Sequence, residues 1–116
     1  MDYLSVQAAD ILEDWRMIRE ILENLFRERK QDHTTSYMEK GIDLFKQLLL
    51  LTNDIPYIPE SFIPFDQLRF KPVNVEERMG FIAARPHLFH SYRQLSELMV
   101  EQEKLYTKKL IKKSSR

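Results

Sequence analysis

The stretch of sequence that decides the fold is LSVQAADILEDWRMIREILENL, residues 4–25. Its apolar positions recur at alternating steps of four and three residues: Leu4, Ala8, Ile11, Trp15, Ile18, Leu22 and Leu25. This period of 3.5 residues places all of them on one helical face. Because neither glycine nor proline interrupts residues 5–31, the pattern predicts one long amphipathic helix there. The strict heptad also permits a homodimer through this helix.

A second helix is predicted from about residue 36 to residue 52. Its apolar residues follow the same steps of four and three: Met38, Ile42, Phe45 and Leu49. Ser36 and Glu39 have the spacing of a capping box, in which a hydroxyl and a carboxylate each accept a backbone N–H. Gly41 costs about 1 kcal/mol relative to alanine inside a helix. We expect it to mark a close helix crossing.

Two more helices are predicted in the C-terminal half of the chain. The shorter spans residues 75–84, with Asn74 as its N-cap. The longer extends to Lys112, and Pro86 suits its first turn, where the missing N–H of proline does no harm. Its apolar residues again have helical spacing: Leu88, Tyr92, Leu95 and Met99.

The register of this last helix weakens after Met99. Gln102 and Lys109 occupy the positions at which the apolar face would continue. Residues 113–116 are expected to fray as a basic tail.

Residues 53–73, between the second and third predicted helices, combine prolines with many apolar residues. The prolines disfavour helix for themselves and for the residue before each: Pro56, Pro59, Pro64 and Pro72. A disordered linker would not carry the apolar residues found among them: Ile55, Tyr57, Ile58, Phe62, Ile63, Phe65, Leu68 and Phe70. The segment is therefore predicted to be an ordered, extended strap across the helices, with a short helical turn at residues 65–68.

These elements predict an all-α fold. An amphipathic helix cannot bury its own apolar face, so the helices must pack against one another. The expected architecture is a single domain, residues 1–116, built as an antiparallel four-helix bundle with a Pro-rich extended strap between helices 2 and 3.

The composition excludes several classes of protein. The 116 residues include no cysteine, which removes disulfides, thiolate catalysis and Cys-ligated zinc. Only two glycines are present, too few for a glycine-rich phosphate loop. The longest apolar run, residues 48–51, is far too short to span a bilayer, and the N-terminus lacks the pattern of a secretory signal. We therefore expect a soluble, cytoplasmic protein with no membrane span.

The sequence contains no convincing catalytic or metal site. His87 and His90 lie three residues apart on the last predicted helix, but no Glu-x-x-His motif accompanies them. Ser91 follows His90 directly, and neighbours on a helix point away from each other. We expect no catalytic residue, no metal and no cofactor. A metal-dependent enzyme that uses His87 and His90 is kept as an alternative.

The formal charge of zero is a cancellation between the two ends of the chain. Residues 1–26 hold six acidic and two basic residues, a net charge of −4, whereas residues 103–116 hold six basic and one acidic residue, a net charge of +5. The favoured interpretation is that the basic last helix lies beside the acidic first one. The alternative is weak nucleic-acid association through four lysines: Lys108, Lys109, Lys112 and Lys113.

The strap is the best candidate for a partner-binding surface. Ordered loops that expose apolar residues can anchor a partner protein. The candidate anchors are Tyr57, Ile58, Phe62, Ile63 and Phe65, with Arg85 behind them. Arg85, at a helix junction, is expected to tie the strap to helix ends through its N–H donors. The alternative is that the apolar strap residues only cover the core. The favoured function is a non-enzymatic protein–protein interaction or accessory factor with an unknown protein partner.

Three stretches carry a resemblance to a known family. They are KPVNVEER at residues 71–78, RPHLF at residues 85–89 and QLSEL at residues 94–98, the last followed by Glu101 and Lys104. In these motifs the chain resembles the YpoC-like family of small bacterial proteins, over about residues 50–112. The resemblance implies a mostly helical, cytoplasmic protein and offers no catalytic residue to carry over.

Overall fold

The first two helices form an antiparallel hairpin. The computed structural model describes residues 3–114, with the side chains of residues 7–30 and 32–112. Helix α1 spans Tyr3–Arg27 and helix α2 spans Thr34–Thr52, with a short 3-10 turn, η1 (Gln31–His33), before α2. The predicted first helix therefore ends four residues early. The reason is a backbone turn at Arg29, whose φ of 57° is left-handed.

The C-terminal ends of α1 and α2 are Schellman turns made without glycine. After α1, Lys30 N–H donates to Leu25 O at 2.9 Å and Arg29 N–H to Phe26 O at 3.2 Å. The same pair of bonds closes α2, where Asp54 has a φ of 59° and the N–H of Ile55 donates to Leu50 O at 3.0 Å.

Of the two predicted caps, the one at Ser36 is wrong, and the one at Asn74 is in the predicted place but lacks the side-chain hydrogen bond. Helix α2 begins at Thr34, before Ser36, and its N-cap His33 makes no side-chain cap hydrogen bond. Asn74 does precede helix α3 (Val75–Ala84), but with a φ of 57° its side chain also makes no cap hydrogen bond. Both starts are set by the backbone turn that leads into the helix, which the capping pattern does not reveal.

Helix α4 spans Phe89–Ser114 and begins three residues after Pro86. The predicted start is wrong because the chain makes a separate turn first, in which Leu88 N–H and Ser91 Oγ both donate to the carbonyl of Arg85, at 3.3 and 2.6 Å. The helix continues through Ser114, two residues beyond its predicted end at Lys112. Residues 115–116 lie outside the described part of the chain.

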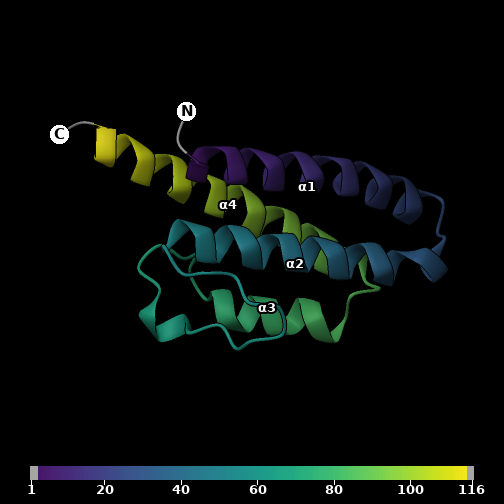
Figure 1. The fold of residues 1–116 in the computed structure, drawn as a ribbon. Coiled ribbons are helices and arrows are strands. Elements are labelled where there is room, and N and C mark those ends of the chain that lie inside the picture. The colour runs from purple at the N-terminus through teal and green to yellow at the C-terminus, as the bar shows by residue number, and fades with distance from the viewer. Residues whose placement is uncertain (1–2, 115–116) are drawn as a thin grey trace.

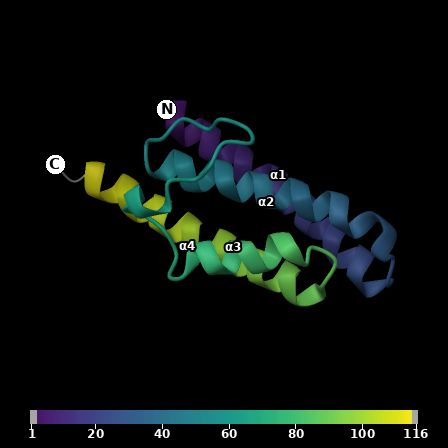
Figure 2. The same cartoon turned by 90° about the horizontal axis from the view of Figure 1, so that it is seen from below.

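The described residues form four α-helices and no strand, which confirms the all-α prediction. Successive helices run in alternate directions (Figure 1). Helix α2 packs against both α1 and α4, and α3 packs mainly against α4. Viewed from below, α1 and α2 lie on one side of the bundle, and α3 and α4 on the other (Figure 2). Between residues 3 and 114, no helix is long and apolar enough to cross a membrane.

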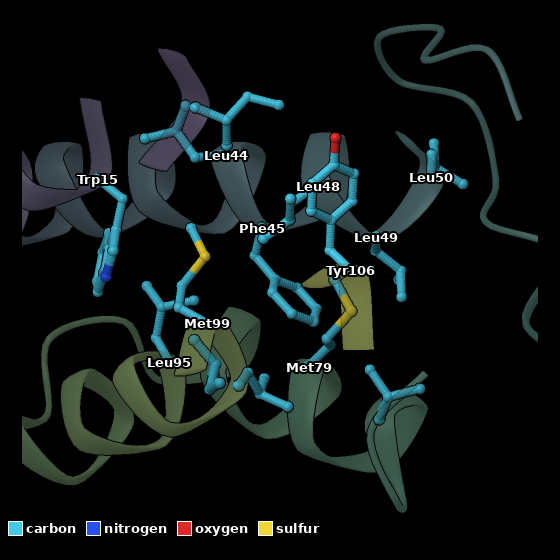
Figure 3. Packing of buried hydrophobic residues seen from close by; sticks show 14 of the residues in the cluster. Trp15, Leu44, Phe45, Leu48, Leu49, Leu50, Met79, Leu95, Met99 and Tyr106 are labelled. Atoms are coloured by element: carbon cyan, nitrogen blue, oxygen red, sulfur yellow. The ribbon is translucent and has the colours of Figure 1, made fainter. Parts of the chain in front are cut away.

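The core lies between these two helix pairs, and α2 contributes most to it (Figure 3). Phe45, Leu48 and Leu49 of α2 are fully buried, and Phe45 extends from α2 toward the helix pair that carries Leu95 and Met99 (Figure 3). The predicted face of α1 is also buried, at Ala8, Ile11, Trp15 and Leu22, whereas the side chain of Leu4 lies outside the described ones. These residues of the heptad face therefore pack within the fold of the chain itself.

Gly41 marks the close helix crossing that the sequence predicts. A Cβ built at this position would lie 2.8 Å from Cζ3 of Trp15 and 2.9 Å from Cδ2 of Leu95. Helices α1 and α4 therefore both approach α2 at this residue, and a side chain would push them away.

An arginine fixes α3 to α4. The guanidinium of Arg78 donates two hydrogen bonds to the carboxylate of Glu101, at 3.2 and 2.6 Å, and one to the carbonyl of Val73 at 3.2 Å. The bond to Glu101 raises the pKa of Arg78 further above its ordinary value. Helix α3 is therefore joined to α4 by this ion pair as well as by the packing of its apolar residues.

Candidate functional site

The strap between α2 and α3 is a loop with a closed neck. The Asn53 side chain pairs with the backbone of Phe70, 17 residues away: its Nδ2 donates to Phe70 O at 2.9 Å, and Phe70 N–H donates to its Oδ1 at 2.8 Å. The same Nδ2 donates to Leu49 O at 2.8 Å. One amide therefore joins both ends of the loop to the last turn of α2.

Helix α4 completes this neck with two polar residues. Gln102, fully buried, donates from Nε2 to Phe70 O at 3.1 Å. Lys109 donates from Nζ to Thr52 O at 2.5 Å and to Asp54 Oδ2 at 2.7 Å, and its side chain is only 12% exposed. Its positive charge sits at the C-terminus of α2, where free carbonyls carry partial negative charge.

Gln102 and Lys109 are the two residues that break the apolar register of the last helix. The structure explains the break: both side chains reach across to the strap and to the end of α2. Their positions in the sequence were the only signal of this role. The backbone acceptors that they bind could not be read from the pattern.

The five predicted strap anchors fall into two groups. Tyr57, Ile63 and Phe65 are half-buried and pack against the core. Ile58 is 61% exposed, and Phe62, at 101%, has its whole side chain in solvent. A short 3-10 turn, η2 (Phe65–Gln67), follows, as predicted. The strap therefore both covers the core and presents two apolar residues.

Tyr57 fixes the first part of the strap to α2. Its hydroxyl donates a hydrogen bond to a carboxylate oxygen of Asp43. This bond, with some burial, raises the pKa of Tyr57 to about 12. Lys71 holds the second part, because its Nζ donates to Phe65 O at 2.7 Å. With the neck, these contacts leave the strap held at several points on either side of Phe62.

The structure does not bring Arg85 to the strap. The turn after α3 lies at the opposite end of the bundle from the strap (Figures 1 and 2). The Arg85 guanidinium lies 4.8 Å from the centroid of the Phe81 ring, a cation–π contact at its own end of the molecule. The tie between strap and helices that the sequence assigned to Arg85 is made instead by Asn53, Gln102 and Lys109.

The remaining candidate residues are the two histidines near the start of α4 and the lysines near its end. His87 and His90 are both exposed, and the His90 ring packs edge-on against Phe81, with centroids 5.5 Å apart. Among the described side chains, no group of three or more histidine, aspartate or glutamate residues could hold a metal ion. Lys108 and Lys112 are exposed, whereas the side chain of Lys113 lies outside the described ones.

Comparisons with known proteins agree with the resemblance seen in the sequence motifs. No curated protein and no solved structure matches the chain. A family model described as YpoC-like protein matches residues 5–114, which adds the first helix to the region that the motifs cover. Because this match spans nearly the whole sequence, the chain belongs to the YpoC-like family.

Proposed function

We propose that this protein is a non-enzymatic interaction factor of the cytosol, and that Ile58 and Phe62 are its anchors for a protein partner. The observation that carries the proposal is the complete exposure of Phe62 on a loop whose two ends are fixed. A solvent-exposed phenylalanine side chain adds no hydrophobic stabilisation to the fold of its own chain. It contributes favourable binding free energy when a partner covers it.

The fixed neck supports the same proposal. Binding through a flexible loop costs conformational entropy, because the loop must be ordered first. Here Asn53 closes the loop, and Tyr57 and Lys71 hold it on both sides of the exposed residues. Presenting Ile58 and Phe62 on such a loop keeps that cost low.

No comparable observation favours the two alternative functions. Lys109, one of the four lysines proposed for nucleic-acid contact, is engaged with Thr52 and Asp54 in the same chain. Lys108 and Lys112 are exposed on α4. For a metal-dependent enzyme, His87 and His90 would need a third ligand, and the described side chains bring none to them.

The test compares three versions of the protein as bait in extracts of the native host. They are the wild type, the double variant Ile58→Ser/Phe62→Ser, and the matched control Val100→Ser, which removes an exposed apolar residue of α4. We expect a protein that the wild type and the control capture and that the double variant loses. With that partner purified, the double variant should bind at least about tenfold more weakly. Equal affinities for wild type and double variant would contradict the proposal.

A further inference from the structure

A groove runs between α1 and α2, and residues 54–57 of the strap bound one end of it. It consists of two hollows of about 720 and 620 Å³ that share Asp14. The α1 residues that line it lie between Gln7 and Ile21 and recur at steps of three and four, which places them on one stripe of the helix. At 1.5 Å per residue, this stripe is about 21 Å long. The groove therefore matches about four turns of another helix.

The floor and one rim of the groove are apolar. Ile11, Leu44 and Leu51 lie at its base as part of the core or packed against it. Met17 is 59% exposed and Ile21 is also exposed, both beside the second hollow. These two large side chains leave apolar surface of α1 in contact with solvent. They would gain burial energy under a partner's apolar stripe.

The residues that line the groove carry a net negative charge. Its lining includes one cationic residue, Lys40, and five carboxylates, a net charge of −4: Asp10, Asp14, Glu39, Asp43 and Asp54. Asp54 pairs with Lys109, and Asp43 accepts hydrogen bonds from Tyr57 and Gln47. The other three carboxylates are exposed and pair with no cation among the described side chains.

We propose that this groove binds an amphipathic helix of a partner protein, with an apolar stripe flanked by lysine or arginine. The apolar stripe would lie on the floor beside Met17 and Ile21, and the cations would meet Asp10, Asp14 and Glu39 at the rim. Lysine and arginine suit this geometry, because their aliphatic stems cover apolar surface while the charge reaches a carboxylate. The sign of the charge also argues against nucleic acid, whose phosphates would be repelled.

A second copy of this chain fits the groove poorly. Its own basic helix end, in α4, already uses its apolar face: Tyr106 is buried in the core and Leu110 packs against it. Lys109 is engaged at the end of α2. The groove and the strap tip are different surfaces, so this inference does not rest on the role proposed for Phe62.

The probe is a labelled 15-residue helical peptide of leucine and lysine with one apolar face, titrated into the full chain by fluorescence anisotropy. Two peptides serve as comparisons: the same pattern with glutamate for lysine, and a scrambled leucine–lysine peptide without an apolar face. We expect binding of the amphipathic lysine peptide only, with an affinity that falls as salt rises. Equal binding of the scrambled peptide, or no binding, would overturn the proposal.

Four variants locate the site. Asp10→Asn/Asp14→Asn and Met17→Ser/Ile21→Ser should each weaken binding at least about fivefold, by removing rim charge or apolar contact. Glu77→Gln/Glu103→Gln is the matched control, because it makes the same change in net charge at exposed positions of α3 and α4. The affinity of this control for the peptide should stay within about twofold of wild type, and equal losses in the two charge variants would refute the assignment.

The strap variant Ile58→Ser/Phe62→Ser should bind the peptide as tightly as wild type. If this variant loses peptide binding, the site lies on the strap and not in the groove. A dimer in sedimentation that Asp10→Asn/Asp14→Asn dissolves would assign the groove to a second copy instead.

Discussion

The two glycines lie inside helices, and the structure gives them opposite surroundings. Around Gly41, a Cβ would meet Trp15 and Leu95 at 2.8 and 2.9 Å, whereas around Gly80 there is nothing within 4 Å. Alanine gains about 1 kcal/mol of helix propensity at either site. At position 41 this gain is outweighed by overpacking, which costs about 1–3 kcal/mol in a close-packed core. Gly41→Ala should therefore destabilise the fold by about 1 kcal/mol, and Gly80→Ala should stabilise it by about 0.5–1 kcal/mol.

Urea unfolding followed by helical circular dichroism measures both changes in the free energy of unfolding. Gly80→Ala is the internal control, since it carries the same propensity gain without the contact. Stabilisation by both alanines would mean that Trp15 and Leu95 give way to the added methyl group, and that the helix crossing is looser than the structure has it.

Single residues also show where sequence patterns stop being informative. The periodic apolar residues, such as Trp15 and Leu95, are buried as predicted, because helical spacing alone decides which face they share. In the strap no such period exists. Phe62 and Phe65 therefore looked equivalent, yet one is fully exposed and the other packs against the core. Their difference depends on a chain path set by Asn53, whose partner Phe70 is distant in sequence.

At the scale of elements, Lys109 joins the end of α2 to α4. Its ammonium group donates to the Thr52 carbonyl and pairs with Asp54, so Lys109→Met should lose both bonds while it keeps most of the aliphatic stem. Because hydrogen bonds from charged groups contribute more than neutral ones, and the Asp54 side is exposed, we expect a loss of about 1–2 kcal/mol in the free energy of unfolding. Lys108→Met, at an exposed neighbouring position, should change it by less than about 0.5 kcal/mol.

Hydrogen exchange of the Phe70 amide, which donates to Asn53, reports on the neck directly. The exchange of this amide should speed up in Lys109→Met by more than the change in the global free energy of unfolding accounts for, and it should be unchanged in Lys108→Met. If both variants behave alike, Lys109 is a surface lysine like its neighbour, and the neck is held by Asn53 and Gln102 alone.

The order and type of the elements could be predicted, but their junctions could not. All four helices lie close to their predicted ranges, since each carries its own apolar spacing. The junctions depend on left-handed backbone at Arg29, Asp54 and Asn74, none of them glycine. Such turns leave no mark in composition. The start of α4 instead follows a separate turn at Arg85, which the sequence does not reveal either. Ser36 and Pro86 were therefore assigned to helix starts that lie elsewhere.

For the whole molecule, the sequence predicted a bundle but not which helices meet across its centre. Helices α2 and α4 run in the same direction and share the main core, a contact that periodicity does not encode (Figures 1 and 3). The same holds for the candidate surfaces. The net charge of −4 in the first 26 residues is visible in the sequence. The sequence does not show that part of this negative charge lines a groove with an apolar floor, because the groove exists only where α1 packs against α2.

Global stability should fall at alkaline pH, because two tyrosines are held protonated by the fold. Burial and a 2.8 Å hydrogen bond to Glu23 raise the pKa of Tyr92 to about 12, and the bond to Asp43 raises that of Tyr57 to about 12. A tyrosine in the unfolded chain has a pKa near 10. Since the folded values are higher, their contribution is complete below pH 10 and is lost as the pH rises from 10 to 12.

Urea unfolding at pH 9, 10, 11 and 12 measures this loss, with tyrosinate absorbance recorded in parallel on the folded protein. Lysines also lose their charge in this range, so the tyrosine contribution is the part of the pH dependence that Tyr→Phe substitutions remove. Tyr92→Phe should remove about 1–2 kcal/mol of the decline, because its ring is buried between α1 and α4, and Tyr57→Phe a smaller share, because the strap leaves Tyr57 partly in solvent. An unchanged decline in the double variant would show that neither hydroxyl is held protonated, and that the bonds to Glu23 and Asp43 do not persist in solution.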